Sequence, residues 1–154
     1  MFVIIKHVIK WSFHEELPRK PIAINSSISK SIGIMENDEL CVKIAKIAPK
    51  IRFSGLINHR GRLIAGGMVT KIKSLEDEKK DEMLYMELAL RVKMRQEFDA
   101  DFGHVHFTLS YREKLIVMSY PIGKNVLLVS MDKRKSFDEI PFKIVKIIEK
   151  FTSS

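Results

Sequence analysis

The residues best placed for chemistry in this chain are two histidines, His104 and His106, separated by a single residue. Side chains two apart on a β-strand point to the same face, so this spacing can offer two imidazoles to one metal ion. No third ligand is evident beside them in the sequence, and a single cysteine, Cys41, excludes a thiolate zinc cluster. The pair is therefore a weak metal candidate, and two partly exposed strand histidines are the simpler interpretation.

No other motif indicates catalysis. The chain contains neither G-x-x-x-x-G-K-[ST] nor G-x-G-x-x-G, so it lacks a phosphate-binding loop, and it contains no H-E-x-x-H or C-x-x-C. Asp99 and Asp101 surround the end of an expected helix and are interpreted as surface acids rather than an acid/base pair. We expect no catalytic residues, no cofactor and no enzymatic activity.

Composition narrows the class of protein. The chain has 154 residues and a net charge of +8, with 19 lysines and 8 arginines. Arginine is the better bidentate ligand for phosphate and guanine, so a lysine surplus does not favour nucleic acid as the partner. A single cysteine fits a reducing cytosol, and no apolar run approaches the length of a membrane span. We expect a cytoplasmic protein without a membrane partner, and Cys41 as a packing residue.

The chain divides near Met35. Residues 1–34 carry Pro18 and Pro21, a serine-rich stretch and no sustained periodicity, so we expect a loosely structured arm or an extension from an upstream start codon. Residues 35–154 are expected to form the domain.

The elements positioning these residues follow from hydrophobic periodicity and turn signals. A first helix is expected to begin at Asn37 or Asp38 and to end at Pro49, and a Gly66-Gly67 bulge or bend is expected in the second strand. Capping boxes are expected to open the long helix at Ser74 and the last helix at Ser136. The expected strands are residues 51–57, 62–70, 104–111, 115–120 and 126–131, with a long helix over 76–102 and a last helix from Ile140. The order α-β-β-α-β-β-β-α predicts an α+β fold. Its five-stranded antiparallel sheet has the long helix on one face and the terminal helices on the other.

The long helix is apolar on two sides. Met83, Met86, Leu90 and Met94 form one stripe, and Leu84, Leu88 and Val92 form a second, roughly opposite. A helix with two apolar sides is buried on both. One stripe is expected to face the sheet and the other a second copy or a partner, and periodicity does not decide which.

The segment FSGLINHRGRLIAGG, residues 53–67, resembles the first hairpin of the roadblock (dynein light chain roadblock-type) family. The order of elements also resembles the longin and profilin-like folds. The blocks EMLYMELALRV and REKLIV, at residues 82–92 and 112–117, resemble an uncharacterised family of ammonia-oxidising archaea.

The roadblock resemblance implies a homodimer in which the long helix packs on its copy and the third strand pairs with its mate. The implied interface residues are Met83, Met86, Leu88, Leu90, Met94, Val105 and Phe107. It further implies a non-enzymatic regulator or scaffold with a small GTPase as partner. We expect the partner to dock on the surface not used in dimerisation, with His59, Arg60 and Arg62 at its rim. Two alternatives stay open: a longin/profilin-like sensor domain that binds a small ligand between sheet and helix, and a basic nucleic-acid-associated protein.

Overall fold

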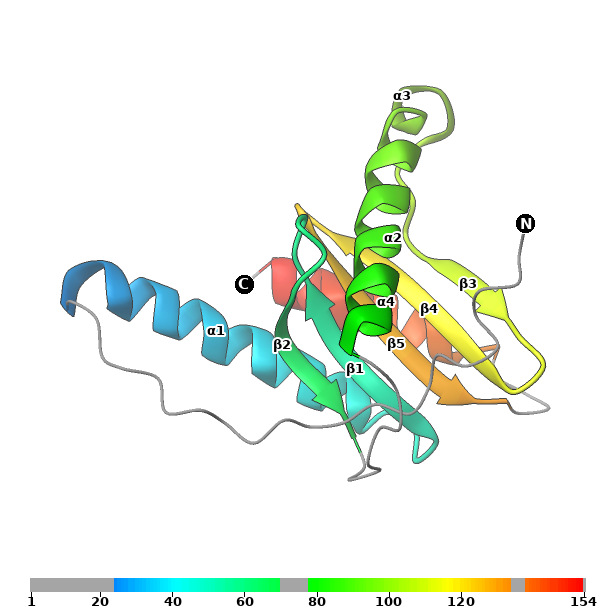
Figure 1. Ribbon diagram of the computed structural model, residues 1–154, viewed down its shortest axis with the longest axis horizontal. Coiled ribbons are helices and arrows are strands. Elements are labelled where there is room, and N and C mark those ends of the chain that lie inside the picture. Colours follow the sequence, from blue (N-terminus) through cyan, green and yellow to red (C-terminus); the bar gives the residue numbers. More distant parts are fainter. Residues whose placement is uncertain (1–23, 70–77, 134–137, 154) are drawn as a thin grey trace.

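The computed structural model describes residues 24–69, 78–133 and 138–153 (Figure 1). The elements in chain order are α1 (Ile24–Ala45), β1 (Ile51–Ile57), β2 (Leu63–Met68), α2 (Glu78–Gln96), α3 (Asp99–Phe102), β3 (Thr108–Tyr111), β4 (Leu115–Ile122), β5 (Asn125–Asp132) and α4 (Ile140–Thr152). All strand pairs are antiparallel, and the sheet order is β2-β1-β5-β4-β3. The predicted α+β fold with a five-stranded antiparallel sheet is confirmed.

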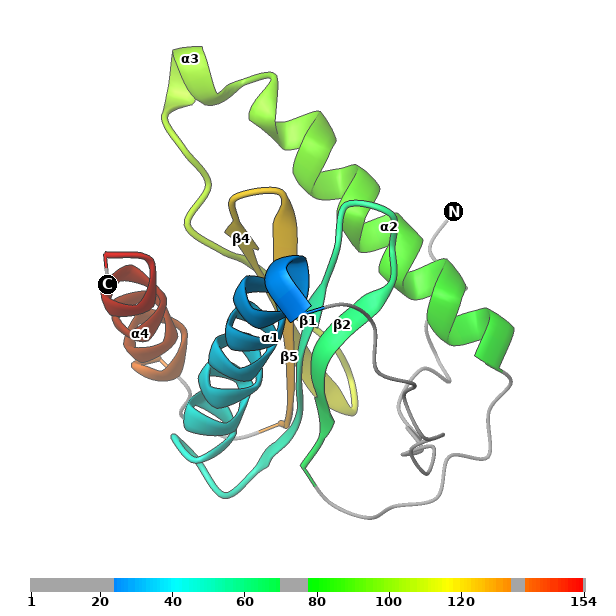
Figure 2. The ribbon, with the colours of Figure 1, turned by 90° about the vertical axis from the view of Figure 1, so that its left-hand side faces the viewer.

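The helices cover both faces of the sheet, as predicted. Figure 2 shows α2 on one side and α1 with α4 on the other. The larger core lies under α1 and α4, where Leu40 and Ile44 of α1 and Ile144 of α4 are buried against alternate residues of β4 and β5. A smaller core lies under α2, around Phe53 and Leu128. The central strands are apolar on both sides because each side is covered by a helix.

Helix α1 differs from the prediction at both ends. It begins at Ile24 rather than near Asn37, and it ends at Ala45, four residues before Pro49. Its serine-rich first part lacks an apolar stripe, so periodicity could not reveal it. The domain boundary predicted at Met35 falls inside α1, whose first residue is Ile24.

The predicted helix over 76–102 is interrupted. Helix α2 ends at Gln96 and the short α3 begins at Asp99, with Phe98 between them at φ −98° and ψ 0°. The strand predicted to start at His104 is shorter than expected, because β3 begins only at Thr108. Helix α4 begins at Ile140 with Pro141 in its first turn, as predicted. The capping boxes expected at Ser74 and Ser136, and the expected start of the long helix at residue 76, involve positions outside the described residues.

The turn between β1 and β2 fixes the hairpin against α2. The side-chain oxygen of Asn58 accepts hydrogen bonds from the backbone amides of Arg60 and Arg62, at 2.9 and 3.1 Å. Gly61 adopts φ +71°, and a Cβ atom placed there would lie 2.7 Å from the Cα atom of Met86 on α2. Only glycine allows the turn and the helix backbone to come this close.

We therefore expect Gly61→Ala to destabilise the protein by about 3 kcal/mol, since the strained φ and the clash with α2 add. Gly123→Ala is the matched control, because Gly123 has φ +56° and open space around its Cβ position. It should cost only the backbone strain, about 1 kcal/mol. Urea unfolding measures the loss of unfolding free energy in each variant. Equal losses in the two variants would show that the turn does not closely contact the α2 backbone.

The two edges of the sheet differ in the hydrogen bonds that their outer strands make. At the β2 edge, the backbone amide of Gly66 donates to the Asp38 carboxylate on α1 at 2.9 Å. Of the bulge or bend predicted at Gly66-Gly67, the bend fits the φ of +71° at Gly66, whereas the register shift of this strand pair lies between Leu56 and Ile57. At the other edge, β3 pairs only with β4 among the described residues. Helix α1 thus accepts a hydrogen bond from one backbone amide of the β2 edge. In the described residues, no strand pairs with the outer side of β3.

Candidate protein interface

Helix α2 carries an exposed row of large apolar side chains. Met83, Met86, Leu90 and Met94 are between 53 and 62% exposed, and Phe98 continues the row just past the end of the helix at 56%. Their spacing of three or four residues puts them on one side of the helix. We call these five residues the apolar stripe. Contiguous exposed apolar surface of this kind marks interaction sites in soluble proteins.

The opposite side of α2 forms the chain's own core, which settles the choice that periodicity left open. Leu88 and Val92 are buried and Leu84 is partly buried against the sheet, with Leu88 next to Phe53 and Leu128. Leu88 was predicted as an interface residue together with the methionines. Its side chain instead packs inside the single chain.

The structure does not bring Val105 and Phe107 into the apolar stripe. Both precede β3 and are partly buried. Phe107 packs on the other face of the sheet, with its ring centroid 5.7 Å from that of Tyr120 and 5.5 Å from that of Phe142. The contribution of Val105 and Phe107 to a dimer stays a prediction. Unlike these two residues, the five residues of the apolar stripe are each more than half exposed.

The residues predicted at the rim of a docking surface outside the dimer interface lie beside the apolar stripe, and their role in docking stays a prediction. His59, Arg60 and Arg62 belong to the β1–β2 turn and are exposed, and Gly61 in that turn contacts the α2 backbone at Met86. Leu63, which follows the turn, is also partly exposed. The stripe is therefore bordered by a basic turn at one side.

A group of arginines borders the stripe near the open edge. Arg91 and Glu87 form the ion pair that their i,i+4 spacing predicts, and the Arg95 guanidinium donates to the Thr108 hydroxyl of β3 at 2.8 Å. Arg112, directly after β3, has a buried Nε atom without a hydrogen-bond partner among the described residues. Burial lowers the pKa of Arg112, Glu87 opposes this and Arg91 adds to it. An unpaired buried donor is costly, so packing within the described residues leaves one polar atom of Arg112 unsatisfied at this edge. Nothing in the sequence indicated this feature of Arg112.

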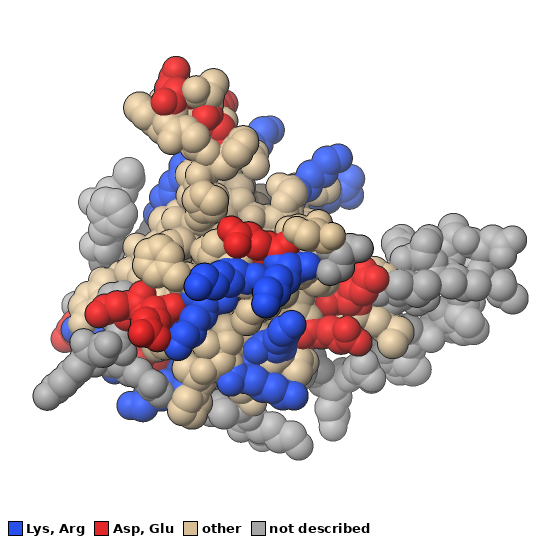
Figure 3. Space-filling model, turned by 180° about the vertical axis from the view of Figure 1, so that it is seen from behind, with Lys and Arg blue, Asp and Glu red and all other residues tan. Residues whose placement is uncertain are grey.

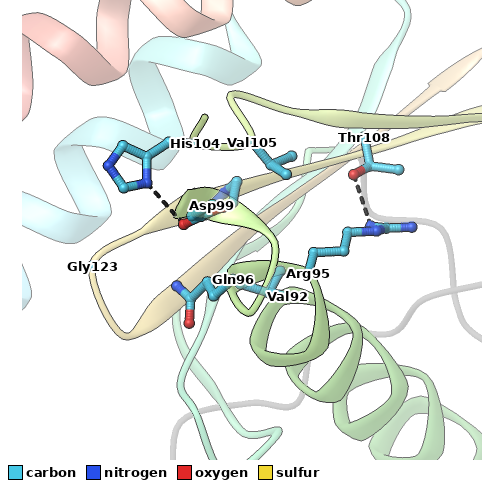
Figure 4. Close-up of a pocket in the computed structure, with 9 residues that line it drawn as sticks. Val92, Arg95, Gln96, Asp99, His104, Val105, Thr108 and Gly123 are labelled. Atoms are coloured by element: carbon cyan, nitrogen blue, oxygen red, sulfur yellow. Dashed lines mark hydrogen bonds and ion pairs between the residues drawn. The ribbon is translucent and has the colours of Figure 1, made fainter. Parts of the chain in front are cut away.

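A pocket of about 260 Å³ lies between the last turn of α2, the segment before β3 and the β4–β5 turn (Figure 4). Arg95 and Gln96 line it from the helix, and Val105 and Thr108 line it from the opposite side. At its mouth, the Nδ1 atom of His104 lies 2.8 Å from a carboxylate oxygen of Asp99.

The predicted metal pair is not assembled as a strand would assemble it. His104 and His106 are both exposed and precede β3, so no regular pleat aligns their imidazoles. The near partner of His104 is Asp99 rather than His106. Within the described ranges, no three His, Cys, Asp or Glu side chains are grouped to hold a metal ion.

The single thiol is enclosed between α1 and the sheet. Cys41 is buried beside Gly66, and burial, with Asp38 nearby, raises the pKa of the thiol to about 11. Only about one molecule in a thousand would carry a thiolate at pH 8. We expect Cys41 to resist Ellman's reagent at pH 8 in the native protein and to react at once in urea. Rapid reaction of the folded protein would show that the thiol is accessible, contrary to its position.

Comparison with known proteins supports the fold. The model of a family of unknown function, DUF6659, matches residues 29–153. No curated protein matches the sequence significantly. In the described part of the chain, no helix has the length and apolarity required to cross a membrane.

Among solved structures, MglB from Myxococcus xanthus has 18% identity and a TM-score of 0.59, and the match covers 78% of this chain and 87% of that one. The gliding protein MglB from Thermus thermophilus has 10% identity and a TM-score of 0.59, covering 78% and 90%. A roadblock/LC7 domain from Streptomyces avermitilis has 11% identity and a TM-score of 0.55, covering 75% and 94%. The chain therefore has a roadblock-type fold.

Proposed function

We propose, given that the chain belongs to the family of unknown function DUF6659 and has a roadblock-type fold, that it is a dimeric, non-enzymatic regulator or scaffold. Its partner in this proposal is a small GTPase, the class that the roadblock resemblance implies, and its place is the cytoplasm. The apolar stripe is the observation that carries the proposal. Its five large side chains are each more than half exposed, on a helix whose other side is already buried.

The open β3 edge supports dimerisation by the same side of the molecule. In an antiparallel pair formed about a two-fold axis perpendicular to the sheet, facing residues point to the same side. Residues of the two β3 copies that face each other must then be an even number apart, for example Leu109 with Leu109 of the partner subunit. Such a pair puts both α2 helices on the same face of a joined sheet, where their apolar stripes can meet.

The arginines near β3 fit the same arrangement. Arg112 follows the strand that would pair, and its basic side chain would lie close to the joined edge. The exposed turn residues His59, Arg60 and Arg62 would remain at the rim, where charges affect association rate and salt dependence more than affinity.

Two measurements test the proposal. Light scattering across micromolar concentrations should give the mass of a dimer, and a monomer throughout would contradict it. Affinity capture from native lysate, with proteins identified by mass spectrometry, should then yield a small GTPase. The purified GTPase should bind differently when loaded with GDP and with a non-hydrolysable GTP analogue. Equal or absent binding in both states would remove the GTPase from the proposal.

The pocket beside Arg95 favours a second candidate, a sensor domain that binds a small molecule between helix and sheet. Native mass spectrometry of the purified protein would distinguish it. A co-purifying small molecule that is lost on Val105→Trp, which would fill the pocket, supports the sensor. Absence of any added mass in the wild type would count against it.

A further inference from the structure

The face opposite α2 carries a concentrated band of lysines. Lys43 of α1, Lys46 directly after α1, and Lys143, Lys146 and Lys150 of α4 are all exposed, and α1 packs against α4. Figure 3 shows basic side chains crossing this face between separate groups of acids. We call these five residues the lysine seam.

The seam follows from the periodicity of the two helices. In α4 the lysines are spaced by three and four residues and so share one side of the helix, away from buried Ile144. Ile47, just after α1, and Ile147 of α4 are partly buried against the core beneath the helices. The lysines therefore lie above partly buried isoleucines, where the two helices pack against each other.

The seam is narrow because acids border it. Glu36 and Glu39 are exposed on α1, Asp138 is exposed just before α4, and Glu149 is exposed on α4. Glu139 also pairs with Lys143 at 2.8 Å, although both side chains are more than half exposed, so this ion pair is readily exchanged for another. A narrow positive track between negative borders matches one extended chain of negative charges.

We propose that the lysine seam binds an acidic segment of a partner protein. A bilayer or a duplex presents a broad negative surface that would also meet the bordering acids, which disfavours both. The seam contains no arginine, the residue suited to bidentate phosphate recognition. Lysines serve here as point charges for carboxylates.

An apolar anchor lies beside the seam. Phe142 is 58% exposed and is one helical turn from Lys146, and its ring packs edge-on against Phe107. A ring held in place by a neighbouring ring is a ready contact for one apolar side chain of the segment. The preferred ligand is thus an acidic peptide with one large apolar residue.

This surface goes beyond the proposed function, because it needs neither the dimer nor the GTPase. It would let the protein hold an acidic partner on one face while α2 is engaged on the other.

The test uses the full chain and a short fluorescein-labelled peptide of Glu and Asp with one central Leu, followed by anisotropy at low salt. Lys46→Gln with Lys146→Gln should weaken binding about tenfold, as expected for two lost ion pairs. Lys114→Gln with Lys124→Gln removes the same charge from two exposed turns and should leave the affinity unchanged. Equal losses in both double variants would overturn the proposal, because binding would then follow net charge alone.

Two further arms identify the partner class and the anchor. Phe142→Ala should weaken binding of the Leu peptide but not of a peptide with Gly at that position, and equal weakening of both would remove the anchor. Phosphatidylserine vesicles and a DNA duplex should bind more weakly than the peptide, and tighter seam-dependent binding of either would overturn the assignment to protein. The Leu90→Glu variant should bind the peptide as the wild type does, which separates this surface from the α2 face.

Discussion

Leu88→Glu should destabilise the protein by about 4 kcal/mol, a large part of the stability of a domain this size. Leu88 is 9% exposed and packs with Phe53, Ile57 and Leu128, so a carboxylate there would lose its hydration without gaining a partner. Thermal unfolding followed by circular dichroism should show a fall in Tm of about 10 °C or more.

Leu90→Glu is the matched control for that experiment. Leu90 lies two residues further along α2 and is 56% exposed, so its replacement should change the Tm little at protein concentrations where the wild type is monomeric. If the two variants melt together, the assignment of one side of α2 to the core and the other to solvent is wrong.

The same Leu90→Glu variant should become a folded monomer. In an isologous interface each substitution occurs twice, and the two new carboxylates would be buried near one another on the apolar stripe. The dissociation constant of the dimer should rise at least about a hundredfold, the effect of roughly 3 kcal/mol. Light scattering over a dilution series measures it.

Val42→Glu on α1 controls for the loss of any exposed apolar side chain. Val42 is 51% exposed and lies on the opposite face from the stripe. This variant should keep the wild-type mass. A dimer that survives Leu90→Glu would show that the stripe is not its interface. The proposal that the protein dimerises through α2 would then be wrong.

Local signals predicted most of the fold. The strand 51–57 has the observed bounds of β1, because an apolar run between Pro49 and the Asn58 turn has sharp limits on both sides. The start of α1 had no such signal, since serines and isolated isoleucines give no stripe. The break at Phe98 was missed for the opposite reason, because an apolar residue in step with the stripe continued the helical pattern through it.

The candidate site was predicted only in part. Sequence revealed two apolar sides of the long helix, but which of them meets the sheet depends on packing against Phe53 and Leu128, far away in the chain. The roadblock resemblance placed Phe107 at the interface, through pairing of the third strand with its mate. In the structure Phe107 precedes β3 and, like Leu109, packs against the core under α1 and α4. The unpaired Nε of Arg112 has no sequence signature at all.

The hydrogen bond from Gly66 to Asp38 has a consequence for growth of the assembly. A sheet that offers both edges can add copies head to tail without end, which produces fibres. In the described part of this chain, α1 occupies an amide of one edge and leaves the other free, so a copy joined through β3 presents only blocked β2 strands outward. In the proposed dimer, the Asp38 carboxylate would therefore disfavour further strand addition at the outward β2 edges by already holding one of their amides.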